Sequence, residues 1–214
     1  MVKIRWMGHA CFEIKDKVTL VTDPHDGYSL GLPKPKAEAD LVLISHSHFD
    51  HADGRSLVCK PNALIIDEPG FHNVLGVKVK GVKTYHDERR GAQRGVNIVY
   101  TFEMDGLKLC HAGDLGHILT DEQAAEVGSV DVLFIPVGGV YTIDARGANE
   151  VVKQLKPRVV IPMHYKVKGL TLPISGVEPF LKGKPRLKIL DKLEYELTKE
   201  TLPDEVEIVV FKPP

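Results

Sequence analysis

Short apolar segments separated by turn-forming residues dominate the first half of the chain. VKIRW (2–6), CFEIK (11–15) and VTLVT (18–22) have the length and the β-branched residues of strands. LVLIS (41–45) is continuously apolar, which is typical of a strand buried on both faces. VKVKGVKTYH (77–86) repeats with period two, which indicates a strand with one buried face. The first half is therefore predicted to be mainly β-sheet.

The second half combines strands with two helices that carry capping signals. VNIVYTFEM and LKLCHAG flank Asp105-Gly106, a dipeptide that favours a two-residue hairpin. TDEQAAEVG is predicted to be a helix, because Thr120 and Gln123 have the spacing of a capping box. DARGANEVVKQLK is predicted to be a helix capped by Asp144. Three further segments are predicted to be mostly strand: DVLFIPV, RVVIPMHY and the tail from 187 to 211.

The order of these elements indicates a loose internal duplication. Strands followed by a helix occupy residues up to about 95, and the same order returns in residues 96–214. A chain of 214 residues is long enough to bury a sizeable core. We therefore predict one α/β domain over residues 1–214, in which two mixed halves pack sheet to sheet with helices outside.

Composition and charge exclude several classes of protein. Apolar residues make up 43% of the chain and charged residues 27%, which is ordinary for a soluble globular protein. A net charge of −1 argues against nucleic acid as a partner. No apolar run approaches the roughly 20 residues that span a bilayer, and the N-terminus lacks the features of a signal peptide. Three widely spaced cysteines indicate reduced thiols, so we expect a cytoplasmic protein without a membrane segment.

The stretch SHSHFDH, residues 45–51, carries the strongest chemical signal. Four side chains that can bind a metal are crowded into six positions directly after the apolar run LVLI. Further histidines and an aspartate follow other apolar strands, at the edge where sites gather in α/β sheets. A cluster of this kind is much more specific than a single histidine at a strand end, and it predicts a metal site. The seven candidate ligands are His46, His48, Asp50, His51, His86, Asp114 and His164.

The spacing of these residues divides them between two ions. In an extended segment His46 and His48 point the same way and can bind one ion. The first predicted ligand set is His46, His48 and His86; the second is Asp50, His51 and His164. Asp114 is then the natural bridging carboxylate. Nitrogen and oxygen ligands without thiolate favour Zn²⁺, with Mn²⁺ or Fe²⁺ as alternatives.

SHSHFDH also resembles the HxHxDH signature of the metallo-β-lactamase superfamily. His86 in TYHDE, Asp114 in HAGDLGH and His164 in IPMHY match the order of the remaining ligands of that family. Asp23 in VTDP resembles its early aspartate, which orients a ligand histidine. The resemblance covers residues 4 to about 166. It implies an αββα sandwich of two mixed sheets with a di-metal site at one edge.

Other motifs refine the resemblance within the superfamily. GHACFEI, HAGDLGH, PVGGVYTIDA and IPMHY are most similar to metal-dependent hydrolases related to ascorbate-6-phosphate lactonase. A carboxylate such as Asp114 is typical of the lactonase and phosphodiesterase branches, whereas the antibiotic-hydrolysing branches have cysteine there. The iron flavoprotein branch has glutamate where this chain has His48. The resemblance therefore implies neither a β-lactamase nor a di-iron redox protein.

These residues predict a hydrolase. Divalent ions lower the pKa of bound water towards about 7, which supplies a hydroxide for attack on a small, anionic ester, lactone or phosphodiester. Asp50 and Asp114 are the predicted catalytic residues, because they can orient the nucleophile and relay a proton to the leaving group. Two alternatives remain open, a metal-dependent nuclease of the same fold and a non-catalytic, metal-bound binding protein.

A few residues are assigned less specific roles. His9, His117 and Tyr141 are candidates for contact with the ligands or with the substrate, and Lys166 is a candidate anion contact. His111 is expected to be structural, and His25 to be solvated in a loop. The charged segment ERRGAQRG, residues 88–95, is either a solvated hairpin or a loop that binds an anion.

Overall fold

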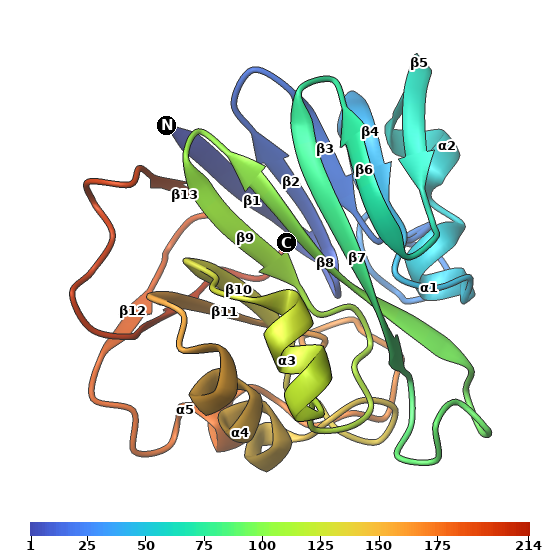
Figure 1. Cartoon of the computed structure of the whole chain (residues 1–214). Helices are drawn as coiled ribbons and strands as arrows, with labels where there is room; N and C mark the ends of the chain where they lie inside the picture. The colour runs from blue at the N-terminus through green and yellow to red at the C-terminus, as the bar shows by residue number, and fades with distance from the viewer.

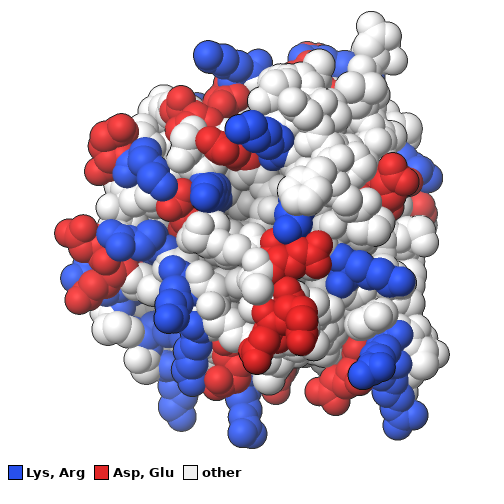
Figure 2. Space-filling model, viewed as in Figure 1, with Lys and Arg blue, Asp and Glu red and all other residues white.

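Two β-sheets stacked face to face form the centre of the protein. The computed structural model describes residues 1–214, and Figure 1 shows the two sheets with helices on their outer sides. Positive and negative side chains are interspersed over the face drawn in Figure 2. No helix is both long and apolar enough to cross a membrane. The arrangement is the predicted αββα sandwich.

The first sheet contains six strands, mostly from the N-terminal part of the chain. β1, β2 and β3 are antiparallel neighbours, whereas β4 and β5 continue the sheet in parallel with β3. The strand that pairs with the other side of β1 comes from near the C-terminus. In spatial order the strands are β13 (Glu194–Leu197), β1 (Val2–Gly8), β2 (Cys11–Lys15), β3 (Thr19–Thr22), β4 (Ala39–Leu43) and β5 (Cys59–Ile66).

The second sheet contains eight strands and is also mixed. Its β6 to β9 form an antiparallel meander, and β9, β10, β11, β14 and β12 are parallel. In spatial order the strands are β12 (Leu187–Ile189), β14 (Glu207–Val210), β11 (Val159–Met163), β10 (Val132–Pro136), β9 (Leu107–His111), β8 (Val96–Met104), β7 (Val77–Tyr85) and β6 (Gly70–Val74).

Helices cover the outer face of each sheet. The short helices α1 (Phe49–Ala52) and α2 (Arg55–Val58) place Ala52 and Val58 in an apolar cluster of eight buried residues on the first sheet. The second sheet is covered by α3 (Asp121–Val127), α4 (Ala145–Leu155) and α5 (Glu178–Leu181). The main core of 52 buried residues fills the space between the sheets and extends to the helices on the second sheet, with Trp6, Phe12 and Phe134 among its largest side chains.

Local signals in the sequence are confirmed where they involve turns and caps. Asp105 and Gly106 both have positive φ, 47° and 73°, as a two-residue hairpin between β8 and β9 requires. Thr120 and Gln123 form the complete capping box of α3. Asp144 accepts hydrogen bonds from two backbone N–H groups at the start of α4.

The sheets do not divide the chain at residue 95. β6 and β7 precede that point but belong to the second sheet, and β13 lies far beyond it but belongs to the first. The strands β5 and β6 and the short helices α1, α2 and α5 were not predicted. Each of these helices has only four residues, which is too short to show a helical repeat in the sequence.

The topology brings the ends of six strands to one edge of the sandwich. β1, β3 and β4 run in the same direction, because two antiparallel steps separate β1 from β3 and β4 is parallel to β3. The same reasoning gives β7, β9 and β11 a common direction. The polar residues that follow these strands are therefore neighbours in space although they are far apart in sequence.

Candidate metal centre

Every candidate ligand follows the C-terminal end of a strand or lies in the short helix α1. His86 and His164 come directly after β7 and β11, and Asp114 lies three residues beyond β9. Asp50 and His51 are in α1, which follows β4 and the turn that contains His46 and His48. The side chains form two groups that meet at Asp114.

The outer group consists of His46, His48 and His86. Their ligand nitrogens all lie within 4.8 Å of one another. The ring centroid of His46 is 4.5 Å from that of His48 and 4.7 Å from that of His86. His48 is exposed at the surface, whereas His86 is buried. Three imidazoles at this separation can bind one ion.

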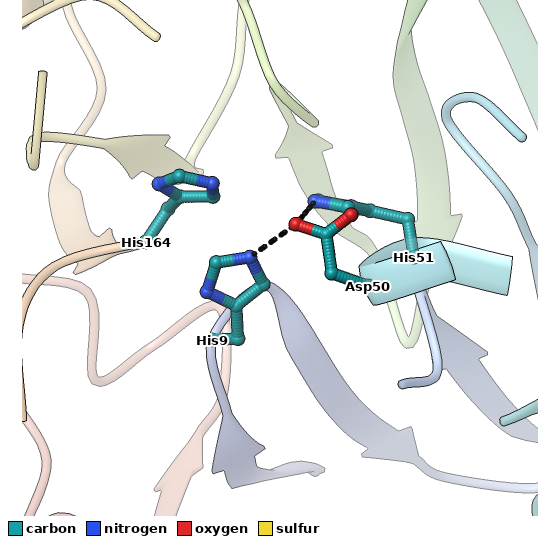
Figure 3. A group of neighbouring side chains, drawn as sticks. All are labelled: His9, Asp50, His51 and His164. Atoms are coloured by element: carbon teal, nitrogen blue, oxygen red, sulfur yellow. Dashed lines mark hydrogen bonds and ion pairs between the residues drawn. The ribbon is translucent and has the colours of Figure 1, made fainter. Parts of the chain in front are cut away.

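The inner group consists of His9, Asp50, His51 and His164, and Figure 3 shows these four side chains converging. Asp50 Oδ2 lies 3.1 Å from His9 Nε2 and 3.6 Å from His51 Nε2. The rings of His9 and His164 are 4.0 Å apart between centroids. All four residues are buried. His9, assigned only a tentative contact from the sequence, is part of the cluster itself.

Asp114 lies between the two groups. Its Oδ2 is 3.2 Å from Nε2 of His86 in the outer group and 3.2 Å from Nε2 of His164 in the inner group. Its Oδ1 is 3.2 Å from Nε2 of His51. The carboxylate is almost fully buried, at 1% exposure. This position is the one that a carboxylate bridging two ions would need.

Asp23 fixes the orientation of His51 from behind. Its Oδ2 accepts a hydrogen bond from His51 Nδ1 at 2.9 Å and another from the Ser45 hydroxyl at 2.7 Å. Because Nδ1 of His51 carries the proton, Nε2 is left as a free lone pair that faces the cluster. Ser45 Oγ is in turn 3.0 Å from Nδ1 of His46, and this contact sets the ring of His46 in the same way. The sequence indicated Asp23 but gave no sign of Ser45.

Asn97 is a supporting residue that the sequence analysis missed. Its Oδ1 accepts a hydrogen bond from the backbone N–H of Asp114 at 2.8 Å, and its Nδ2 donates to Thr84 Oγ1 and to Ala112 O. Asparagine is depleted in strands, so a buried asparagine in β8 is the signal that could have identified it. A Cβ on Gly113 would lie 2.4 Å from Asn97 Oδ1, so this turn accommodates no larger residue.

Three residues around the centre have left-handed backbone conformations. His9, Asp23 and His164 have φ values of 53°, 39° and 50°. Such values are uncommon for residues other than glycine and carry a conformational cost. Each of the three directly follows a strand. The left-handed conformation changes the direction of the backbone there, and the side chain points towards the centre.

The electrostatics of the centre favour a positive charge in its middle. Burial and the neighbouring His51 lower the pKa of His46 to about 3, and burial and His164 lower that of His9 to about 3. Burial also opposes a charge on His51, but the carboxylates around it raise the pKa of His51 well above its usual value. Against the effect of burial, His164 and His51 hold the pKa of Asp114 well below its usual range. The carboxylate of Asp114 is thus ionised and the imidazoles of His9 and His46 are neutral, whereas His51 holds a proton that a metal ion at its Nε2 would displace.

The unsatisfied polar atoms of the centre test whether a metal fits. His46 Nε2, His51 Nε2, His164 Nε2 and Asp114 Oδ1 are buried and have no hydrogen-bond partner. Buried polar atoms without partners are costly and rare, and most of those in this chain belong to residues of this centre. Divalent ions would satisfy these atoms, so the donor set fits a metal centre.

Several predicted contacts lie elsewhere. The ring of His117 accepts from the Tyr85 N–H and contacts Ile118 O, outside the cluster. Lys166 donates to two backbone carbonyls, Leu170 O and Leu172 O, so its charge is not directed at the centre.

His25 is buried and not solvated as predicted, because its ring turns back towards β1 and donates to Met7 O. His111 is structural as expected, since it donates to Ala10 O and accepts from Gly113 N.

A cavity of about 360 Å³ opens in front of the centre, which we call the metal cavity. Its walls include His48, Asp50, His86 and Asp114 from the two groups. Tyr141, a predicted substrate contact, is also in the wall, together with Arg94 from the segment 88–95. The guanidinium of Arg94 lies over the Tyr141 ring, 5.3 Å from its centroid. The centre is therefore accessible to a small molecule.

Residues 3–164 match the family model described as the β-lactamase superfamily domain. The chain belongs to the metallo-β-lactamase superfamily. A UPF0173 metal-dependent hydrolase of Thermococcus onnurineus is 32% identical over 238 residues, which cover 100% of this chain and 97% of that protein. The match places the chain in the UPF0173 family of metal-dependent hydrolases. The relation to ascorbate-6-phosphate lactonase stays a prediction.

Solved structures agree with this assignment. One is a protein of Thermotoga maritima, described as a candidate Zn-dependent hydrolase of the superfamily. It is 42% identical to this chain, and the two structures superpose with a TM-score of 0.82. The match covers 99% of this chain and 98% of the Thermotoga chain. A second structure, from Parabacteroides distasonis, is 20% identical with a TM-score of 0.68 and covers 97% of this chain and 92% of its own. The second similarity shows the fold alone. The predicted fold class is confirmed.

Proposed function

We propose that the protein is a binuclear metal hydrolase that cleaves a small ester, lactone or phosphodiester. The observation that carries this proposal is the position of Asp114, 3.2 Å from a ring nitrogen of each group. The outer group would hold one ion through its three imidazoles. The inner group would hold the second through Asp50, His51 and His164. The nitrogen and oxygen donors, without a thiolate, suit Zn²⁺ best, and Mn²⁺ or Fe²⁺ next.

The metal ions, when bound, lower the pKa of a coordinated water and polarise the oxygen that accepts negative charge. The chain supplies the geometry. Asp23 and Ser45 hold the rings of His51 and His46 with their Nε2 atoms facing inward. Asp114 holds the two groups at a fixed separation, because its own backbone is anchored by Asn97.

Asp50 is the best candidate for moving a proton. Its neighbours lower the pKa of Asp50 even though burial opposes ionisation, so the carboxylate is charged and accepts a hydrogen bond from His9 Nε2–H. His9 thereby fixes one carboxylate oxygen of Asp50. The side chain is in the wall of the metal cavity, where it can accept a proton from the attacking water and return one to the leaving group.

The size and charge of the surroundings favour a small anionic substrate over a nucleic acid. The metal cavity of about 360 Å³ is near the lower end of the range for small-molecule sites. Arg94 adds a cation to its wall. The net charge is −1, and the face in Figure 2 shows no broad basic surface. Three unpaired cysteines support a reducing, cytoplasmic location.

Metal analysis and a panel of hydrolysis probes test the proposal together. Metal-free protein would be reloaded with Zn²⁺ or Mn²⁺, its metal content measured, and turnover followed on a phosphodiester, an aryl ester, a lactone and a β-lactam. We expect about two ions per chain and turnover of at least one of the first three probes, rising with pH. Asp50→Ala should abolish turnover with the fold intact. One ion or none at saturation, or efficient turnover of the β-lactam alone, would overturn the proposal.

A further inference from the structure

A second, larger cavity adjoins the metal cavity. It has a volume of about 740 Å³, and we call it the arginine cavity. The two cavities share four wall residues, which are His86, Gln93, Arg94 and Tyr141, so they are direct neighbours. A molecule whose reactive group reaches the metal centre would therefore have space for a further part on the other side of the Arg94–Tyr141 pair.

The charges that are free to act in the arginine cavity are mainly positive. Arg89, Arg94 and Arg146 are in its wall, and none of the three forms an ion pair within the protein. The wall also contains four carboxylates. Asp87 and Asp144 are hydrogen-bonded to backbone N–H groups, and Glu150 pairs with Lys153. Glu88 is the one acidic side chain of the wall without such a partner, against three arginines. Unpaired guanidinium groups around a cavity are suited to bind a carboxylate or phosphate, because their N–H fork matches the oxygens of both.

The loop that carries two of these arginines is held rigidly next to the metal centre. Asp87 accepts hydrogen bonds from the backbone N–H groups of Arg89, Gly91, Gln93 and Arg94, at 2.7 to 3.0 Å. Asp87 directly follows His86 of the outer group. The loop and the metal centre are thus positioned by consecutive residues.

The other side of the shared wall is also fixed. Tyr141 N–H donates to Gly139 O at 2.7 Å, which closes a tight three-residue turn around Val140. Val140 has a φ of 64° and is 59% exposed. A β-branched residue in this conformation is strained, and such strain is found mainly where function requires a fixed geometry. The turn presents the Tyr141 ring to Arg94.

We propose that the arginine cavity binds an anionic group of the substrate that is remote from the bond to be cleaved. The ligand class is an oxyanion, either a carboxylate or a phosphate, joined by a short linker to the reactive ester or phosphodiester. Arg94 contacts both parts, and Arg89 and Arg146 contact the remote anion alone. This inference rests on the proposed function, since it deepens the substrate class of the same site.

Non-hydrolysable ligands test the inference by binding alone. Isothermal titration of the metal-loaded protein would compare butylphosphonate, 4-phosphonobutyrate and propane-1,3-diphosphonate. All three carry a phosphonate for the metal centre, but only the last two carry a remote anion. We expect a remote carboxylate or phosphonate to tighten binding about tenfold, and the tighter of the two tails identifies the preferred anion. Metal content would be measured after each titration.

Variants of the arginines locate the effect. Arg146→Gln and Arg94→Gln should reduce the preference for the remote anion to about twofold or less. Arg90→Gln is the matched control, because Arg90 is exposed on the same loop but is in the wall of neither cavity, and the change in charge is identical. The control should keep the full preference. Equal binding of all three ligands by the wild type, or an equal loss of preference in Arg90→Gln, would overturn the inference.

The result is independent of catalysis. If the protein shows the preference for a remote anion but hydrolyses no probe, the anion site is supported and the proposed function is wrong. If it hydrolyses the probes but shows no such preference, the proposed function is supported and the anion site is wrong.

Discussion

The inner and outer groups of the metal centre differ in how firmly the protein holds them. In the inner group every residue is buried, His51 is held by Asp23, and Asp50 is held by His9. In the outer group His48 is exposed, and it lies in the turn directly before α1. Both groups share Asp114. The histidine ligands of the inner group are therefore held in place before an ion binds, whereas His48 of the outer group is free to adjust its position.

This difference predicts unequal roles for two ions. A preorganised site loses less freedom when an ion binds, so the inner group should bind more tightly. The more exposed outer group should exchange its ion faster and is closer to the arginine cavity through His86. The following four experiments are ordered from the largest expected effect to the smallest.

Asp114→Ala should have the largest effect, because it removes the one carboxylate common to both groups. We expect the metal content to fall from about two ions to less than one, and hydrolysis to fall by about 10³-fold. Metal analysis of the dialysed variant measures the first and steady-state kinetics the second. His117→Gln is the control, since His117 lies outside both groups. Retention of two ions by Asp114→Ala would show that the groups are not coupled through this residue.

Asp23→Asn should weaken the inner group selectively and destabilise the fold. The change removes the charge that the buried His51 faces, and breaking a buried pair of this kind typically costs about 3 kcal/mol. Urea unfolding of the metal-free protein measures the loss, and metal titration should show weaker binding at one of two sites. A variant with unchanged stability would mean that the inner group is not preorganised by Asp23.

His48→Ala should release only the outer ion. Because His48 is exposed, little packing is lost, and the unfolding free energy should change by less than about 1 kcal/mol. Metal analysis should find about one ion per chain. His164→Ala is the matched change in the inner group, where the side chain is fully buried. His164→Ala should instead weaken binding of the inner ion. If both variants lost the same ion, with the same decrease in metal affinity, the distinction between the two groups would be wrong.

The smallest effect is expected from His25, which is buried near the centre but belongs to neither group. Burial lowers the pKa of His25 below its usual value of 6.5. Below pH 6.5 the unfolded chain therefore takes up a proton that the folded chain does not, and the stability falls as the pH decreases. The contribution is at most about 1.4 kcal/mol per pH unit. In His25→Gln the unfolding free energy should depend less steeply on pH between 6.5 and 5; an unchanged slope would contradict the assignment.

The sequence predicted those parts of the structure that depend on local chemistry. Thr120, Asp144 and Asp105-Gly106 act within a few residues of themselves, so their roles could be read directly. The candidate ligands could also be recognised, because each lies shortly after an apolar strand segment and their residue types are suited to metals. Their actual binding to metal stays a prediction until the ions are measured.

The remaining parts depend on contacts between distant segments. Asn97 supports Asp114 across 17 positions, and Ser45 supports Asp23 across 22. An asparagine within a strand marks Asn97 as unusual, but nothing in the local pattern indicates which distant residue it or Ser45 contacts. The burial of His25 and the pairing of β13 with β1 likewise arise from the folded arrangement. Arg94 was recognised only as part of a charged segment, because its place beside Tyr141 depends on the turn at Val140.

The pairing of β13 with β1 has a consequence for the synthesis of the chain on the ribosome. β1 is made first, but the strand that covers its outer edge is residues Glu194–Leu197. Until those residues emerge, the edge of β1 is open to pairing with other chains. His164 of the inner group also emerges late. The nascent protein therefore cannot complete either its first sheet or its inner metal group until most of the chain has been translated.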